Sequence, residues 1–290
     1  MHGLGNDFVV LDHKTLDSAP LRPFPLEKLA ATLCDRHFGI GADGLIVVSP
    51  ADDPKTADLK FVYLNGDGSW AEMCGNGIRC FALYAKQHGY LHSNTFRAET
   101  RAGTLTLTIH PDDTVTVDMG APVLEAARIP FVSGNGLSAS AVVQDYPLSV
   151  LGKTLPVTLV SMGNPHCLIF QNDLDTPLDP AQFGPAIENH PNFPNKTNVE
   201  FLEVLDDHTL RATVWERGCG FTLACGTGAC ASAVGALLLE KITTPKIDVL
   251  LPGGKLLIEW NAQANADKNA HVFMTGPATT VFDGIFHLAL

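Results

Sequence analysis

Two cysteines carry the same short motif in distant parts of the chain. Cys74 lies in the stretch MCGNGIRC and Cys225 lies in ACGTGAC, and a run of helical composition follows each motif. Glycines at the start of a helix allow several backbone N–H groups to point into one concavity, beside the positive end of the helix dipole. Such a site can bind a carboxylate. It can also lower the pKa of the thiol from ~8.5 toward neutrality, where a thiol acts readily as acid or base.

Two thiols of this kind indicate proton transfer rather than nucleophilic catalysis. If the two halves of the chain face each other, one thiolate can remove a proton from a stereocentre while the other thiol delivers a proton to the opposite face. This chemistry requires no cofactor and no metal, and helix N-termini would stabilise the charge that spreads into a bound carboxylate. The N–H groups expected to bind that carboxylate belong to the residues directly after the cysteines, Gly75, Asn76, Gly226 and Thr227.

The remaining cysteines are interpreted as buried structural residues, since free cysteine is among the most buried residue types. They are Cys34, Cys80, Cys167, Cys219 and Cys230. A zinc site built from Cys219, Cys225, Cys230 and His166 is a weak alternative, because it contains no CxxC pair. GIGADG at Gly39–Gly44 matches the dinucleotide fingerprint GxGxxG, but it precedes a strand, which is the reverse of the required context.

Two helices and a set of short strands must position these residues. We expect helices over Gly77–His88, with Gly89 as a stop, and over Gly228–Glu240, which is apolar nearly all round and must be buried on all sides inside a curled sheet. Most connections are too short for parallel crossovers, which predicts largely antiparallel sheets. The expected strands are Phe8–Asp12, Leu45–Val48, Leu59–Leu64, Leu105–Ile109, Val115–Asp118, Pro156–Val160, Leu168–Gln171, Glu200–Leu205, Leu210–Trp215, Ile247–Leu250, Lys255–Trp260 and Val272–Thr275.

The order of motifs occurs twice, roughly 150 residues apart, which indicates duplication of a half. Asn6 in GLGNDF matches Asn164 in SMGNPH, and polar loops beginning at Asn65 and Glu216 each start nine residues before a motif cysteine. We therefore predict an α+β fold of two pseudo-symmetric domains, each a largely antiparallel, barrel-like curled sheet around a central helix. The segment Asn172–Asn198 is expected to be the longest irregular stretch.

The composition excludes several classes of protein. The 290 residues suffice for two domains, and the net charge of −12 without any basic run argues against binding to nucleic acid or to an anionic membrane. Seven cysteines, an odd number, favour a reducing compartment. Residues 1–13 contain no export signal, so we expect a cytoplasmic protein, or one of the plastid stroma if the chain is processed from a longer precursor.

The motifs together resemble the diaminopimelate epimerase family. HGLGNDFVVLD, GIGADG, MCGNGIRCFA, SMGNPHC, WERGCGFTLACGTGACA and LPGGKLLIEW run from one end of the chain to the other. The resemblance implies a pyridoxal-independent enzyme that interconverts LL- and meso-diaminopimelate in lysine and peptidoglycan biosynthesis. It also implies a homodimer and a C-terminal strand that returns to the first domain. The expected domains are residues 1–118 with 277–290, and residues 119–276.

Site residues can be carried over one by one from this resemblance. It makes Cys74 and Cys225 the proton-transfer pair, with His166 and Glu216 as their auxiliary groups. Arg217 is suited to bidentate capture of a second carboxylate. The other substrate contacts that it implies are Asn6, Asn65, Asn164 and Asn198. Gly44, which stands where some members of the family have a glutamine, is a further expected contact.

Three alternatives stay open on the sequence alone. A proline or hydroxyproline racemase would also use two cysteines, although proline has no distal zwitterion for Asn65, Asn164, Asn198 and Arg217 to bind. A thiol-disulfide redox protein would use Cys74 and Cys225 as a dithiol. A catalytically inactive binding module would keep the loops for carboxylate capture alone.

Overall fold

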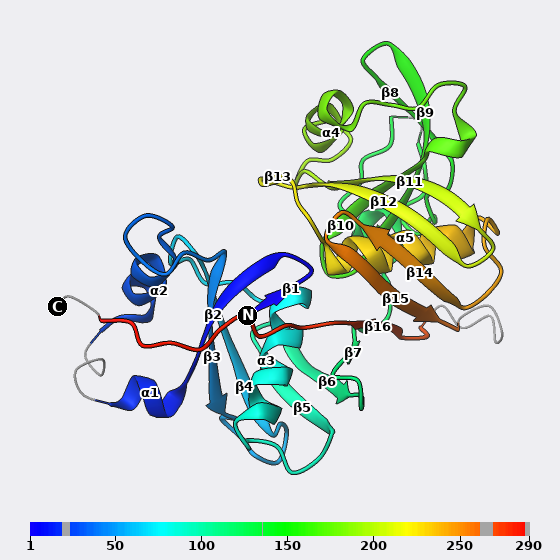
Figure 1. The fold of residues 1–290 in the computed structure, drawn as a ribbon. Helices are drawn as coiled ribbons and strands as arrows, with labels where there is room; N and C mark the ends of the chain where they lie inside the picture. Colours follow the sequence, from blue (N-terminus) through cyan, green and yellow to red (C-terminus); the bar gives the residue numbers. More distant parts are fainter. Residues whose placement is uncertain (19–23, 135, 262–268, 288–290) are drawn as a thin grey trace. The chain divides into compact units, whose positions relative to one another are not determined.

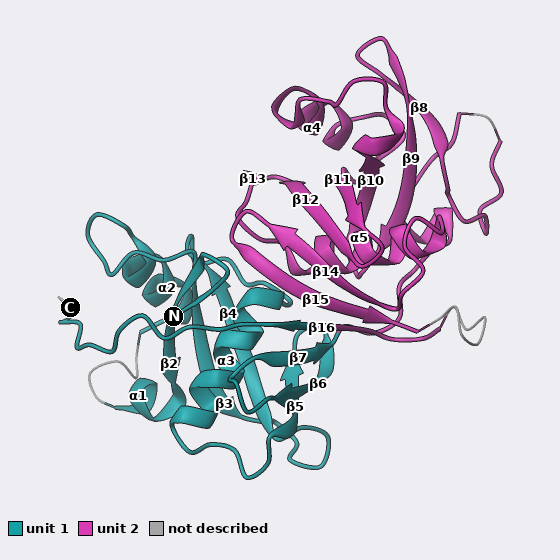
Figure 2. Ribbon diagram, turned by 45° about the vertical axis from the view of Figure 1, so that its right-hand side comes forward, with its two compact units in different colours: residues 1–118, 275–290 teal, residues 119–274 magenta. Residues whose placement is uncertain are grey.

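The chain divides into two compact units. The computed structural model describes residues 1–18, 24–134, 136–261 and 269–287. Unit 1 comprises residues 1–118 and 275–290, and unit 2 comprises residues 119–274 (Figure 2). The chain re-enters unit 1 at residue 275, two residues before the expected position 277. Residues 288–290, which belong to the expected first domain, lie outside the described residues. Strand β16 (Val272–Gly276) carries the chain from unit 2 back to unit 1.

In its described residues, unit 1 has seven strands before the chain crosses to unit 2. Their spatial order follows the chain, from β1 to β7. The strands are β1 (His2–Gly3), β2 (Asn6–Asp12), β3 (Gly44–Pro50), β4 (Leu59–Asn65), β5 (Thr95–Thr100), β6 (Gly103–Ile109) and β7 (Val115–Asp118). The helices of this unit are α1 (His13–Asp17), α2 (Leu26–Cys34) and α3 (Gly75–Gln87).

Unit 2 likewise consists of neighbouring strands and a few helices. Its spatial order is β15-β14-β12-β11-β10-β9-β8, with the short β13 paired to β12. The strands are β8 (Tyr146–Val150), β9 (Lys153–Ser161), β10 (Pro165–Phe170), β11 (Asn198–Asp206), β12 (Thr209–Glu216), β13 (Gly220–Phe221), β14 (Lys246–Leu251) and β15 (Gly254–Trp260). The helices are α4 (Pro180–Glu188) and α5 (Gly226–Leu238), and two short 3₁₀ turns lie at Ala126–Arg128 and Gln171–Asp173.

Four of the strand pairs whose register is given are parallel, which the prediction of largely antiparallel sheets allows. They are β2–β3 and β4–β5 in unit 1, and β10–β11 and β12–β14 in unit 2. Every one of these pairs is joined through a helix, as parallel strands require. In particular α3 is the crossover between β4 and β5, and α5 is the crossover between β12 and β14. The remaining pairs whose register is given are antiparallel, as predicted.

The two crossover helices are enclosed by their sheets (Figure 1). Helix α3 packs against β1, β2, β3, β4, β6 and β7, and α5 packs against β9, β10, β11, β12, β14 and β15. Every residue of α5 except Thr227 and Leu238 is buried, which confirms the prediction from its composition. Gly89 takes the left-handed conformation that ends α3. Among the residues that the structure describes, no helix is long and apolar enough to cross a bilayer.

The sequence analysis missed several elements. Helix α4 lies inside Asn172–Asn198, which was expected to be irregular, and Asp179 caps its start by accepting from the N–H of Ala181. Strands β5 and β8 were not predicted either. Their apolar residues are few and interrupted by polar ones, so that only pairing with neighbouring strands fixes them.

A stability prediction follows from the packing of α5. A Cβ added at Gly235 would lie 2.2 Å from Cδ1 of Leu168 on β10, and Leu168 is fully buried. We expect Gly235→Ala to lower the free energy of unfolding by about 1–3 kcal/mol through overpacking, even though alanine favours a helix interior over glycine by about 1 kcal/mol. Urea unfolding of Gly235→Ala, Leu168→Ala and the double variant would test this. The double variant should lose less than the sum of the single losses, and strict additivity would contradict the contact.

Candidate active site

The two motif cysteines are the N-caps of the two enclosed helices. Cys74 Sγ accepts a hydrogen bond from the N–H of Gly77 at 3.4 Å, and Cys225 Sγ accepts one from the N–H of Gly228 at 3.4 Å. Both cysteines have extended backbone conformations, as N-caps do. The helices therefore start at Gly75 and Gly226, two residues earlier than expected. Gly75, Asn76, Gly226 and Thr227 form their first turns, where backbone N–H groups have no intrahelical partner.

In unit 1, the side chain of Asn6 links Cys74 to the preceding loops. The Cys74 thiol donates to Oδ1 of Asn6 across 3.6 Å, and Nδ2 of Asn76 donates to the same oxygen across 3.4 Å. Nδ2 of Asn6 donates to Asp43 at 2.7 Å. This network orients the Asn6 amide with its oxygen toward Cys74.

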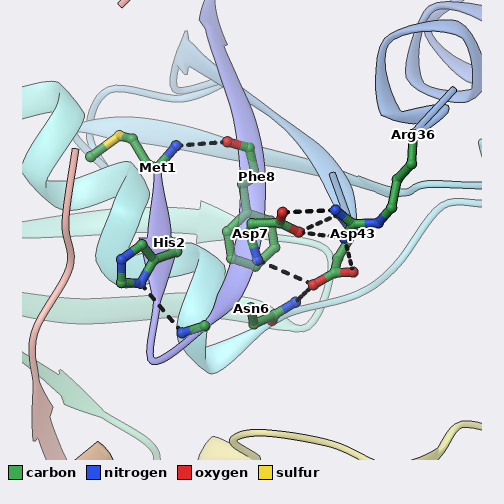
Figure 3. Close-up of polar contacts among 8 residues, drawn as sticks. Met1, His2, Asn6, Asp7, Phe8, Arg36 and Asp43 are labelled. Atoms are coloured by element: carbon green, nitrogen blue, oxygen red, sulfur yellow. Dashed lines mark hydrogen bonds and ion pairs between the residues drawn. The ribbon is translucent and has the colours of Figure 1, made fainter. Parts of the chain in front are cut away.

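An ion cluster holds Asn6 in place (Figure 3). Arg36 reaches between Asp7 and Asp43, with Nη1 and Nη2 donating to the two oxygens of Asp7 at 3.0 and 2.8 Å and Nη2 also donating to Asp43 at 2.8 Å. Although partial burial acts in the opposite direction, the hydrogen bonds from Arg36 keep the pKa of Asp7 below its ordinary value. The GLGND and GIGAD loops are thereby fastened to each other through their aspartates.

The other two site candidates of unit 1 differ in character. Asn65, half-buried at the end of β4, accepts from the Tyr63 hydroxyl at 3.1 Å and donates to Ser69 at 2.9 Å. Gly44 is buried in β3, where an added Cβ would lie 2.6 Å from Cε2 of Tyr63. The absence of a side chain at Gly44 is thus required by the packing of Tyr63.

In unit 2, the surroundings of Cys225 overturn one expectation. The thiol is almost fully buried, and burial, followed by the carboxylate of Glu216, raises its pKa well above the ordinary value. The hydrogen bonds from Thr227 and Gly228 act in the opposite direction but are weaker. The prediction of a pKa lowered toward neutrality by the helix N-terminus is therefore wrong for Cys225, because removal from water outweighs the helix dipole.

His166 and Glu200 form a fully buried pair beneath the start of α5. Nδ1 of His166 lies 2.6 Å from Oε1 of Glu200, and both side chains have no exposed surface. Nε2 of His166 lies 3.0 Å from Oδ1 of Asn164, so both ring nitrogens of this histidine are already engaged within unit 2. Gly228 leaves room for the carboxyl group, since a Cβ there would lie 2.8 Å from Oε1 of Glu200.

The remaining candidates of unit 2 lie on strands β11 and β12 and the loop after them. Asn198 is buried, and its amide donates to the carbonyl of Pro165 at 2.9 Å and accepts from the N–H of Arg217 at 2.8 Å. The exposed guanidinium of Arg217 donates from Nη1 to the carbonyl of Asn195 at 3.0 Å. Within the described ranges no carboxylate pairs with it. The half-buried Glu216 accepts from the Thr222 hydroxyl.

The known proteins most informative for this site share the chain's whole length. The family profile described as "Diaminopimelate epimerase" matches residues 1–125 and 158–281. The diaminopimelate epimerase of Desulfitobacterium hafniense is 50% identical, covering 98% of this chain and 96% of its own, and that of Synechocystis sp. is 47% identical with the same coverage. The chain belongs to the diaminopimelate epimerase family.

Solved structures with the same fold include other isomerases. A methylitaconate-delta-isomerase matches with a TM-score of 0.63 at 13% identity, covering 98% of this chain and 92% of its own. A hydroxyproline epimerase from Agrobacterium vitis matches with a TM-score of 0.62 at 16% identity, covering 95% and 86%. At these identities the likeness concerns the fold alone, and it agrees with the predicted α+β architecture.

The sheet registers of this diaminopimelate epimerase family member align its two halves residue by residue. Phe8 pairs with Gly44 across the parallel β2–β3 ladder, and His166 pairs with Asn198 across the parallel β10–β11 ladder. If Phe8 is matched with His166, and Gly44 with Asn198, then Asn6, two residues before Phe8, corresponds to Asn164, two residues before His166. In the same way, Ile46 of β3 corresponds to Glu200 of β11.

Glu200 was not predicted from the sequence, and one cysteine that was expected to be buried is exposed. Glu200 lies between the buried Val199 and Phe201, and a carboxylate inside such an apolar run is the signal that could have identified it. Cys34, Cys80, Cys167 and Cys230 are buried free thiols as expected, whereas Cys219 is exposed because it lies in the turn before β13.

Burial of Glu200 gives a testable dependence of stability on pH. Burial raises the pKa of Glu200 above its ordinary 4.5, with Glu216 adding to the effect and His166 opposing it. A group whose pKa is higher in the folded state contributes stability at low pH and loses it as the pH rises through the folded value. From pH 4.5 upward the wild type should therefore lose stability relative to Glu200→Gln, by up to about 1.4 kcal/mol per pH unit. Urea unfolding of both proteins between pH 4.5 and the neutral range measures this difference, and a constant difference would show that Glu200 titrates normally.

Proposed function

We propose that this protein interconverts LL- and meso-2,6-diaminopimelate by proton transfer at the α-carbon between Cys74 and Cys225, without a cofactor. The observation that supports this most directly is the duplicated cap, in which both thiols accept from the third residue after them at 3.4 Å. The reaction would serve lysine and peptidoglycan-precursor biosynthesis, and on that ground we place the protein in the cytoplasm.

Each turnover moves one proton off the substrate and another onto it. The thiolate of one cysteine takes the α-proton, and the electron pair of the broken C–H bond spreads into the carboxylate as an enolate. That pair then forms the new C–H bond with the proton of the second thiol, which becomes a thiolate. The raised pKa of Cys225 favours its thiol form, which would deliver the proton that arrives at the α-carbon.

The remaining candidates divide into groups that bind substrate and groups that hold those groups in place. N–H groups at the starts of α3 and α5 are suited to the carboxylate at the reacting carbon, and they stabilise its growing charge. We assign Asn6, Asn65, Asn164 and Arg217 to direct contacts and Glu216 to the neighbourhood of Cys225. Asn198 instead positions Arg217 through its backbone N–H, and Gly44 makes room for Tyr63.

Isotope exchange tests the proposed reaction directly. LL-diaminopimelate incubated with the protein in heavy water, with a thiol reductant and no pyridoxal phosphate, should gain deuterium at the α-carbon and yield the meso isomer. Activity on proline or hydroxyproline alone would select a racemase of the same fold. No exchange with any of these substrates would leave a binding or redox protein and refute the proposal.

We further propose that the protein is a homodimer. Phe38, Val281, Phe282 and Ile285 of unit 1 expose between 62% and 89% of their surfaces, and exposed apolar groups in such number favour an interface. Sedimentation equilibrium should give twice the mass of the chain, and Ile285→Asp should shift the protein toward the monomer. A monomeric wild type at micromolar concentration would contradict this.

A further inference from the structure

The buried carboxyl group of Glu200 is only half satisfied. Oε1 faces Nδ1 of His166 at 2.6 Å, whereas Oε2 is buried and has no hydrogen-bond partner in the described part of the chain. An ionised oxygen in this position would be far more costly than the carbonyl oxygen of a neutral acid. The geometry therefore favours Glu200 as a carboxylic acid that donates its proton to Nδ1 of His166.

The duplicated half shows that the fold itself does not require this polar pair. In unit 1 the corresponding positions hold Phe8 and Ile46, both buried. A Cβ added at Gly77 would lie 3.4 Å from Phe8 and 3.2 Å from Ile46, just as a Cβ at Gly228 would meet Glu200. Since one half packs an apolar pair beneath its cysteine helix, the acid and imidazole of the other half serve a purpose other than packing.

The hydrogen bond between Glu200 and His166 determines how His166 contacts Asn164. When Nδ1 accepts the proton of Glu200, the neutral ring carries its own proton on Nε2. Nε2 then donates to Oδ1 of Asn164, 3.0 Å away. This contact turns the amide so that its NH₂ group points away from His166, and the described chain offers no acceptor to that group.

We propose that Glu200 is a positioning residue that keeps Nε2 of His166 protonated and thereby presents the NH₂ group of Asn164 to a carboxylate of the substrate. The inference rests on the proposed function for the identity of that substrate, an α-amino acid. Asn6, at the corresponding place in unit 1, is held the opposite way, with its NH₂ on Asp43 and its oxygen toward Cys74. Oδ1 of Asn6 already accepts from Cys74 and Asn76, so of the two amides it is the NH₂ group of Asn164 that is suited to a carboxylate.

Nitrogen NMR of the wild-type protein tests the proton on His166 without reference to activity. With ¹⁵N-labelled histidine, couplings to the ring protons report which nitrogen is protonated, and loss of one signal set in His166→Gln assigns the residue. Nε2 of His166 should carry a proton throughout the neutral pH range. An unprotonated Nε2 would overturn the proposal, because Asn164 would then have to turn its NH₂ group toward the ring.

Kinetics of three variants test the consequence for the substrate. Glu200→Leu should raise KM for diaminopimelate about tenfold with a smaller change in kcat, since a hydrogen bond to a charged group is lost. Glu200→Gln should recover most of this loss, because its amide N–H can replace the acid proton at Nδ1. The control Glu203→Gln alters an exposed carboxylate of the same strand, which pairs with Arg211, and should behave as wild type.

The outcomes separate the two proposals. If Glu200→Gln is as impaired as Glu200→Leu, the residue acts as an anion and the positioning role is refuted. If the wild type turns over no diaminopimelate, the proposed function fails, whereas the NMR result still decides the state of His166.

Discussion

Cys74→Ala and Cys225→Ala are each expected to lower kcat for epimerisation by about 10²–10⁴-fold, the usual contribution of a general acid or base. Both thiols are needed in every turnover, because one accepts the proton that leaves and the other supplies the proton that arrives. Loss of either should therefore be as damaging in the LL-to-meso direction as in the reverse. Single-turnover and steady-state assays with each isomer measure this loss.

Residual exchange with solvent gives a more specific test of the two-base assignment. A variant with one thiol can still remove and return a proton on one face, so exchange without inversion should be confined to one isomer. The favoured isomer should differ between Cys74→Ala and Cys225→Ala. Cys219→Ser, which alters an exposed thiol, should retain wild-type turnover. Full epimerisation by either motif variant, or exchange of the same isomer by both, would refute the pair.

The parts of the site that lie within one local stretch were predictable from sequence. Cys-Gly-x-Gly before an apolar run predicts a capped, buried helix, and the structure has such helices at α3 and α5. The all-round apolar composition of α5 also predicts its enclosure, because it leaves no face for water. Duplication was visible for the same reason, since matched motifs recur in the same order.

Features that depend on register or on removal from water were not predictable in this way. Glu200 meets His166 only because β10 and β11 are parallel neighbours with His166 opposite Asn198. The raised pKa of Cys225 depends chiefly on its burial, to which the carboxylate of Glu216 adds. Local sequence indicates that a thiol lies at a helix N-terminus, which lowers its pKa, but does not indicate how far the thiol is removed from water. For Cys225 the removal from water has the larger effect on the pKa.

The surroundings of Arg217 are those expected of an anion-binding side chain. Its guanidinium is exposed, and Nη1 donates to the carbonyl of Asn195, so other N–H groups remain for a carboxylate. Its backbone is fixed by Asn198, whose buried amide accepts from the Arg217 N–H at 2.8 Å. Its backbone is fixed, and its planar guanidinium has no carboxylate partner among the described residues. Both features suit bidentate recognition of the distal carboxylate of diaminopimelate.

Arg217→Ala should raise KM for diaminopimelate by about 10–100-fold, because a hydrogen bond to a charged group contributes about 1.5–3 kcal/mol. The change in kcat should be smaller, since the distal carboxylate is bound in the ground state as well as in the transition state. Arg217→Lys should recover only part of the affinity, because an ammonium group cannot make the bidentate contact. Arg211→Ala serves as the matched control, as Arg211 lies on β12, the strand that leads to Arg217, but pairs with Glu203 in solvent. Equal effects of the two alanine variants would show that Arg217 acts through general charge, and the distal carboxylate would then have to be bound elsewhere.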